Sequence, residues 1–176
     1  MSCEVCDYVS GKIRTKKLYE DSDILAVFSP RPAAFGHAIV MPKKHLTILP
    51  QIPDEIIKRM FFVAQQLGSI IFDAVGAEGT NIMINEGVPA GQTHAHAMIH
   101  VIPRKKDDGM AFDWPQKQIP EDSMNKIHEL LKIPESAAEA SEIAPEPEKK
   151  EKPKNEGAKE GVKGYLFKHW TRRIPR

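Results

Sequence analysis

Imidazole side chains are concentrated in one short stretch of the chain. Between residues 94 and 100, three histidines and one methionine occupy every second position, with small or apolar residues between them. In a strand over residues 94–102, that alternation places the histidines and the methionine on one face and the apolar residues on the other. Imidazole binds metal ions and transfers protons near neutral pH. The stretch therefore predicts a strand whose polar face lines a pocket, although an amphipathic strand with surface histidines would show the same pattern.

The two cysteines of the chain, Cys3 and Cys6, are separated by two residues. A disulfide between them would close a very small loop, and a reducing compartment disfavours it. A redox pair normally opens a helix after a first strand, whereas this pair stands before any predicted strand. The spacing therefore favours metal binding, because structural zinc sites combine a close cysteine pair with two distant histidines.

The elements that must position these residues are predicted from apolar spacing. Residues 54–75 repeat apolar side chains at the three-and-four spacing of one helix face, and Gly76 follows them. Short apolar runs bounded by Gly, Pro and Asp predict strands on both sides of this helix. The expected elements are a hairpin over residues 6–32, strands over 35–42, 80–85 and 94–102, and a short helix over 122–132.

Residues 91–104 resemble the signature of the histidine-triad (HIT) superfamily, a group of nucleotide-binding hydrolases and transferases. The family pattern is a Gly-Gln-Ser/Thr turn, two variable residues, histidines at three alternate positions, and often Pro-Arg. His96 and His100 take the first and third histidine positions, and Met98 stands at the middle one. The Cys-x-x-Cys opening and the Tyr-Glu-Asp turn at residues 19–21 are also similar to the family.

The resemblance implies an α+β chain with the HIT-like fold. That fold is an antiparallel sheet of about five strands with one long helix, here with a short C-terminal helix. Family members often form dimers through the central helix and sheet, so a homodimer is also implied.

The resemblance further implies that the chain binds a nucleoside mono- or polyphosphate. In the family the middle histidine attacks the α-phosphorus, and the nucleotidyl-histidine intermediate is then resolved by water or a second acceptor. Met98 offers only a thioether, which has no proton equilibrium near neutral pH. The catalytic positions are therefore Met98, where the nucleophile is lost, and His100. The implied nucleotide-binding residues are Ser29, which stands at the family's ribose-binding aspartate, Asn85, Gly91, Gln92, Thr93 and His100.

The resemblance also implies a metal set. Zinc-containing members bind the ion at positions that match Cys3, Cys6, His45 and His96, so one zinc ion per chain is expected. His37 and His128 have no such support, and both are expected to be ordinary core or surface histidines.

Three functions fit this combination of residues. The leading hypothesis is a binding protein for a purine nucleoside phosphate with little or no hydrolase activity. The second is an active hydrolase or transferase with altered chemistry, such as direct attack by water with His94 or His100 as the base. The third is an interaction module in which the pocket is vestigial. A mutant engineered to trap its ligand could also lack the middle histidine, although Ala, Asn or Gln is the more usual replacement.

Composition indicates one folded domain followed by a polar tail. The 176 residues are 41% hydrophobic, and 25 Lys and Arg nearly balance 24 Asp and Glu, so net charge favours neither nucleic acid nor a membrane surface. With no visible signal peptide or membrane span, a cytoplasmic protein without a membrane partner is expected. The predicted organisation is a HIT-like domain over residues 1–133, a disordered acidic and Pro-rich linker over 134–160, and a basic aromatic segment over 161–176.

The C-terminal segment regains aromatic side chains and carries positive charge without an acidic residue. Such a segment is expected to dock onto the domain, a second subunit or an acidic partner. A solvated tail is the alternative.

Overall fold

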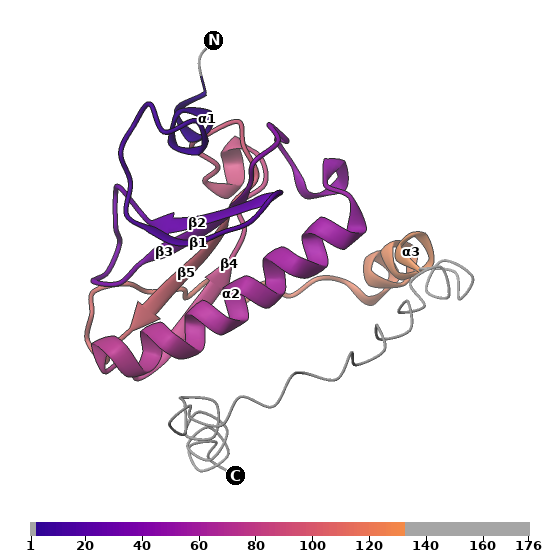
Figure 1. The fold of residues 1–176 in the computed structure, drawn as a ribbon. Coiled ribbons are helices and arrows are strands. Elements are labelled where there is room, and N and C mark those ends of the chain that lie inside the picture. Colours follow the sequence, from indigo (N-terminus) through magenta and orange to yellow (C-terminus); the bar gives the residue numbers. More distant parts are fainter. Residues whose placement is uncertain (1–2, 133–176) are drawn as a thin grey trace, which may run out of the picture. The chain divides into compact units, whose positions relative to one another are not determined.

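A computed structural model describes residues 3–132 of the protein. These residues divide into two units, the first ending at Met110 and the second beginning at Ala111. The first unit is built on a five-stranded antiparallel sheet with the strand order β1-β2-β3-β5-β4 (Figure 1). Because β3 pairs with β5, Ile39 lies opposite His100, and the segment before β3 comes close to the histidine-rich stretch. The strands are β1 (Lys17–Glu20), β2 (Ile24–Phe28), β3 (Ala38–Pro42), β4 (Gly79–Met83) and β5 (Ile99–Arg104).

Helix α2 (Asp54–Val75) covers one face of the sheet. Its buried side chains recur every three or four residues, and it ends at Gly76, whose φ of 60° is the left-handed conformation that favours glycine. The helix and the strands enclose the larger hydrophobic core, called here the α2-side core. Its strand members are Ile24, Ala26, Ala38, Val40, Ile99 and Val101.

The short helix α1 (Glu4–Val9) covers part of the opposite face (Figure 1). Val5 and Tyr8 of this helix are almost fully buried, with exposures of 0% and 3%. They pack on side chains that alternate with those of the α2-side core along β2 and β3, because successive strand residues point to opposite faces. This second cluster, the α1-side core, consists of Val5, Tyr8, Leu25, Val27, Ile39, Met41 and Met98.

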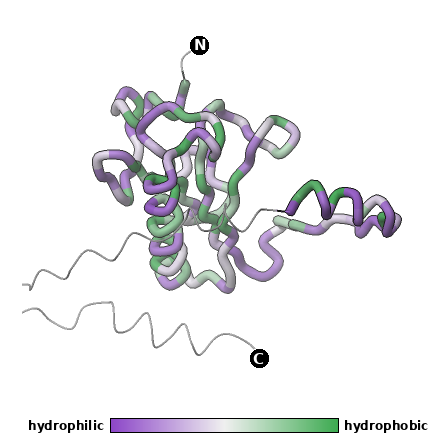
Figure 2. The backbone as a smooth tube through the Cα atoms, turned by 90° about the vertical axis from the view of Figure 1, so that its right-hand side faces the viewer, coloured by the Kyte–Doolittle hydropathy of each residue, from purple (hydrophilic) through white to green (hydrophobic). Residues whose placement is uncertain are grey.

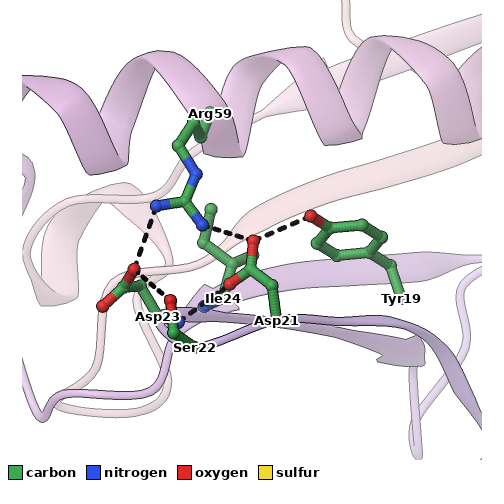
Figure 3. A network of polar contacts seen from close by, with 6 residues as sticks. All are labelled: Tyr19, Asp21, Ser22, Asp23, Ile24 and Arg59. Atoms are coloured by element: carbon green, nitrogen blue, oxygen red, sulfur yellow. Dashed lines mark hydrogen bonds and ion pairs between the residues drawn. The ribbon is translucent and has the colours of Figure 1, made fainter. Parts of the chain in front are cut away.

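The turn between β1 and β2 is tied to α2 by a polar network (Figure 3). One carboxylate oxygen of Asp21 accepts hydrogen bonds from the backbone N–H groups of Asp23 and Ile24, both at 2.8 Å. The other oxygen accepts from the Tyr19 hydroxyl at 2.7 Å and from Arg59. Arg59 also pairs with Asp23 at 2.9 Å. Burial alone would raise the pKa of Asp21, but these hydrogen bonds lower it well below its usual range.

The second unit contains helix α3 (Glu121–Leu131) within its described part. Hydrophobic and hydrophilic residues alternate around its turns, so the helix is amphipathic (Figure 2). The predictions of a linker over residues 134–160 and a docking segment over 161–176 fall outside the described residues. Among residues 3–132, no helix is both long and apolar enough to cross a membrane.

The predicted α+β architecture is confirmed, including the five-stranded antiparallel sheet, the long helix and the short helix near its predicted position. Three short helices were not expected, namely α1, η1 (Leu49–Gln51) and η2 (Val88–Ala90). The predicted strand over 94–102 was wrong at its start, because β5 begins only at Ile99. The His96 N–H donates to the His94 carbonyl at 2.8 Å, and this tight turn interrupts the alternation before Met98.

Candidate functional site

Four nitrogen and sulfur donors converge between α1, the end of β3 and the stretch before β5. The donor atoms of Cys3, Cys6, His45 and His96 all lie within 4.8 Å of one another. The His96 Nδ1 atom is 3.7 Å from the sulfur of Cys3 and 3.7 Å from that of Cys6, while the sulfur of Cys6 is 3.2 Å from His45 Nδ1. Zinc–sulfur and zinc–nitrogen bonds in a tetrahedron place sulfur and nitrogen about 3.6 Å apart. The four residues therefore fit a tetrahedral Cys₂His₂ metal site.

The orientation of His96 is fixed by its second ring nitrogen. Its Nε2 lies 2.9 Å from the carbonyl oxygen of Pro42, and because a carbonyl only accepts, Nε2 must carry the proton. The lone pair is then on Nδ1, which faces the thiols, as a metal ligand requires. Burial is the main cause that lowers the pKa of His96, which keeps the ring neutral. Both ring nitrogens are thus committed, and His96 offers the pocket only its carbon edge.

Without a bound cation, the Cys6 thiol is held in its neutral form. Burial raises its pKa first, and the neighbouring Cys3 raises it further. A bound cation reverses this balance, because the thiolate is the ligand form and a positive ion stabilises it.

A pocket of about 160 Å³ lies next to the metal cluster and shares His96 with it. Its walls come from the end of β4, the loop that leads to the histidine-rich stretch, and the start of β5. The lining residues are Asn85, Gly91, Gln92, Thr93, His96, Met98 and His100. None of these seven is an acid, a lysine or an arginine, so the pocket presents neutral donors rather than a charged clamp.

Five of the six predicted nucleotide-binding residues are among these lining residues. The side chain of Gln92 also holds the surrounding loop through two hydrogen bonds to the backbone. Its side-chain oxygen accepts from the Gly87 N–H at 2.7 Å, and its amide group donates to the Thr47 carbonyl at 2.8 Å. The Asn85 amide donates to the Gly91 carbonyl at 3.4 Å. Gly91 has a φ of 87°, and a Cβ there would lie 3.4 Å from the Asn85 amide nitrogen. Glycine therefore allows the turn to approach Asn85 closely.

Ser29 is the exception among the predicted nucleotide-binding residues. It follows β2 and does not line the pocket. Its backbone N–H donates to the carbonyl of His37, at 2.8 Å, and His37 in turn contacts the lining residue His100.

His37 contacts the pocket residue His100, a role that the sequence analysis missed. Its exposure is only 5%. The Ala33 backbone N–H donates to its Nδ1 at 3.0 Å, which makes Nδ1 the unprotonated nitrogen. Burial first, and then the charge of His100, lowers the pKa of His37 to about 4, so the ring is neutral at pH 7 and its proton is on Nε2. The Gly-His pair at residues 36–37, within the predicted strand over residues 35–42, was the available signal.

The tautomer of His100 follows from this contact. The His37 Nε2 atom is 3.1 Å from His100 Nδ1, and since His37 supplies the proton, His100 Nδ1 accepts it. Burial, followed by the charge of His94, lowers the pKa of His100, which keeps this ring neutral as well. The remaining proton of His100 is then on Nε2. His100 therefore presents a hydrogen-bond donor, not a base, to a ligand in the pocket.

Met98 belongs both to the pocket lining and to the α1-side core. It lines the pocket, and with 8% exposure it is also a member of the α1-side core. The position between His96 and His100 is therefore filled by an apolar side chain that packs against α1, and no nucleophile is present there.

His94 lies outside the pocket lining. Its Nδ1 is 3.8 Å from a carboxylate oxygen of Glu4 in α1, and the same oxygen is 3.4 Å from Arg31. The second oxygen of Glu4 accepts from the Tyr8 hydroxyl. These contacts connect α1 to the loop after β2 and to the segment before His96.

The structure has the antiparallel sheet and the long helix of the HIT-like fold that the resemblance implied. Its neutral, histidine-containing pocket includes Met98 and so adjoins the face of the sheet opposite α2. A family model described as the HIT domain matches residues 10–107, which is more than half of the chain. The chain therefore belongs to the HIT family.

Known relatives share about a third of the matched residues. The adenylylsulfatase HINT3 from Arabidopsis thaliana is 33% identical over 106 residues, which are 60% of this chain and 54% of the plant protein. The chain thus spans about half the length of that relative. The adenosine 5′-monophosphoramidase HNT1 from Candida albicans is 30% identical over 136 residues, which are 74% of this chain and 90% of the yeast protein.

Solved structures agree with the fold. A histidine triad nucleotide-binding protein from Candida albicans superposes with a TM-score of 0.67 at 30% identity, covering 79% of this chain and 99% of the other. A zinc-bound histidine triad protein from Mycobacterium smegmatis superposes with a TM-score of 0.59 at 36% identity, covering 66% of this chain and 85% of the other. The Cys₂His₂ cluster of this chain is compatible with zinc.

Proposed function

We propose that this protein binds a purine nucleoside phosphate in the pocket beside the metal cluster and hydrolyses it slowly or not at all. The observation that carries the proposal is Met98, which lines the pocket of about 160 Å³ at the position of the family's nucleophile. A thioether has no titratable proton and is a poor substitute for imidazole in phosphoryl transfer.

The neutral donors of the pocket support binding of a phosphoryl group. His100 lines the pocket and, in the tautomer set by His37, carries its proton on Nε2, and the Asn85 amide and the glycine turn at Gly91 supply further polar groups around the same space. Fixed donors of this kind hold phosphate oxygens without reorganisation. The relatives whose names refer to adenylyl sulfate and adenosine monophosphoramidate support an adenosine 5′-phosphoryl compound as the ligand.

The metal part of the proposal assigns one zinc ion to Cys3, Cys6, His45 and His96. All four positions are filled by protein ligands, which is the arrangement of a structural zinc ion rather than a catalytic one. When bound, the ion supplies a cross-link between the N-terminal helix, the end of β3 and the histidine-rich stretch. A cytoplasmic location belongs to the same proposal, because the two thiols must stay reduced to bind metal.

The test of the proposed function is a comparison of binding with turnover. Calorimetry with AMP is expected to show one site per chain. Steady-state assays with adenosine 5′-phosphoramidate and adenylyl sulfate are expected to show little turnover in the same preparation. Absence of AMP binding would reject the pocket assignment, whereas fast turnover would reject the binding-only function.

A working hydrolase that uses water directly is the second candidate, and the His94–Glu4 contact at 3.8 Å is the observation in its favour. A carboxylate in contact with one ring nitrogen of a histidine fixes the tautomer and the orientation of the imidazole. The tautomer of His100 disfavours that residue as the base, which leaves His94, whose side chain lies beside the pocket and not in its lining. Loss of turnover in His94→Gln would support this candidate, and unchanged turnover would reject it.

A homodimer is the proposed assembly, with the face formed by α2 and the edge strand β4 as the interface. Phe61 and Ile82 are both 45% exposed on these two elements, and β4 has a free edge among the described residues. An exposed apolar edge favours pairing with another chain. Light scattering of the wild type and Ile82→Lys is the test, with a dimer and a monomer as the expected states. An acidic partner for residues 161–176 stays a proposal from the sequence alone.

A further inference from the structure

Helix α1 takes part in both the metal cluster and the wall of the pocket. Cys3 precedes the helix and Cys6 lies in its middle, and both thiols point at the donor cluster. Val5 and Tyr8 of the same helix pack in the α1-side core with Met98, which lines the pocket. A six-residue segment thus connects the metal ligands to the ligand pocket.

This helix is too short to be stable without those connections. Isolated helices of fewer than about 12 residues are marginal in water, and α1 has only six residues with no side-chain hydrogen bond at its N-cap. Only Val5 and Tyr8 of the helix are fully buried, and Val9 is partly buried against the same core. Glu4 adds contacts with Tyr8, Arg31 and His94. Metal bonds to Cys3 and Cys6 would therefore add order to the helix when the ion is bound.

Loss of α1 would reach the pocket by two routes. Met98 would lose its packing partners Val5 and Tyr8, and a side chain that is now 8% exposed would be solvated from the rear. His96, which lines the pocket, would lose the ligand environment of its Nδ1 and keep only the Pro42 contact. The pocket would then have a mobile wall where the phosphoryl group binds.

We propose that the metal holds α1 over Met98 as the rear wall of the ligand pocket, with Tyr8 as the positioning residue, so that metal and phosphate ligand stabilise each other's binding. The inference rests on the proposed function, since it takes Cys3 and Cys6 as metal ligands and a nucleoside phosphate as the pocket ligand. Because coupling between two sites is reciprocal, one factor describes both effects. Metal removal weakens AMP binding, and bound AMP slows metal loss, because both ligands favour the state in which α1 is packed over Met98.

The first experiment measures the order of α1 and the environment of Met98 without using activity. Hydrogen exchange of residues 4–9 and peroxide oxidation of Met98 are followed by mass spectrometry in zinc-loaded and chelator-treated protein. Removal of zinc is expected to increase both rates by at least about tenfold, while exchange in α2 stays unchanged. Equal rates in the two forms, with the sheet folded in both, would overturn the proposal.

The second experiment separates the helix from the metal by changing Tyr8, which is not a metal ligand. Tyr8→Ala removes the ring from the α1-side core, whereas Tyr8→Phe keeps the ring and loses only the hydroxyl contact with Glu4. Phe35→Ala is the matched control, because this aromatic residue is 88% exposed. We expect Tyr8→Ala to keep its full zinc content, to bind AMP about tenfold more weakly and to show faster Met98 oxidation. We expect Tyr8→Phe to show a smaller change in AMP affinity and in the rate of Met98 oxidation.

The two proposals fail in distinguishable ways. If zinc-loaded wild type does not bind AMP, the proposed function fails, and exchange of residues 4–9 still decides whether metal holds the helix. If AMP binds zinc-loaded protein, metal-free protein and Tyr8→Ala with one affinity, the linkage is refuted and the proposed function stands. Faster release of zinc to a chromogenic chelator in the presence of AMP would also contradict the reciprocal stabilisation.

Discussion

Replacing Met98 by histidine tests the central claim about the pocket, namely that only the nucleophile is missing. Met98 is 8% exposed, and both neighbouring pocket histidines have pKa values lowered by burial. We expect burial to lower the pKa of the introduced imidazole in the same way, which leaves a free ring nitrogen at pH 7. The substitution is therefore expected to add a nucleophile in its reactive form between His96 and His100.

The structure also predicts that this gain has a cost in stability. Met98 packs with Tyr8, Leu25 and Met41 in the α1-side core. Removing a buried methionine loses about 2–3 kcal/mol of apolar burial, and placing a polar ring there costs about 1 kcal/mol more unless a partner satisfies it. We expect Met98→His to unfold about 2–4 kcal/mol more easily than the wild type in urea titrations.

The assay is steady-state hydrolysis of adenosine 5′-phosphoramidate. Mass spectrometry of the protein during turnover then tests for a covalent nucleotidyl-histidine adduct. We expect a rise of about 100-fold or more in kcat/KM for Met98→His. Met98→Leu is the matched control, because it keeps the apolar volume and adds no nucleophile. A folded Met98→His protein that binds AMP but shows no turnover would refute the reasoning, as would equal turnover in the wild type and both variants.

Three further predictions concern the metal, the histidine pair and the β1–β2 turn. Elemental analysis of purified protein should find about one zinc per chain, and freely titratable Cys3 and Cys6 in metal-free native protein would contradict the assignment. His37 has a folded pKa of about 4, below its ordinary value of 6.5; its unfolded state therefore binds more protons, and stability that is complete above about pH 6.5 should fall as the pH drops toward 4. His37→Gln should lose less stability across that window, and parallel curves in urea titrations would rule out this cause. Asp21→Asn should cost about 1–3 kcal/mol at pH 7, because the carboxylate of Asp21 accepts four hydrogen bonds. The Asp21 pKa is depressed, so this difference should shrink as the pH falls below about 4; a constant difference down to pH 2 would argue against the charged network.

Local pattern was sufficient for most of the elements. The three-and-four spacing of α2 and its glycine end are properties of neighbouring residues, and they predict a helix without knowledge of its partner. β2 shows the limit of such reasoning, because its first four residues are buried on both faces and the strand is a continuous apolar run. Which side chains face α1 and which face α2 is decided by packing alone.

The sequence by itself determined that Met98 occupies the middle histidine position, because residue type and order are enough for that. It also showed a close cysteine pair that favours metal, whereas the full set with His45 and His96 was implied by the family resemblance. The tertiary structure decided that Met98 is packed under α1, that Gln92 braces the loop around the pocket, and that His94 lies outside the lining. It also decided the tautomer of His100, through a contact with His37 across 63 positions of the chain. Hydrogen bonding and burial of this kind depend on which segments the sheet brings together, and β3 pairing with β5 has no signature in either strand alone.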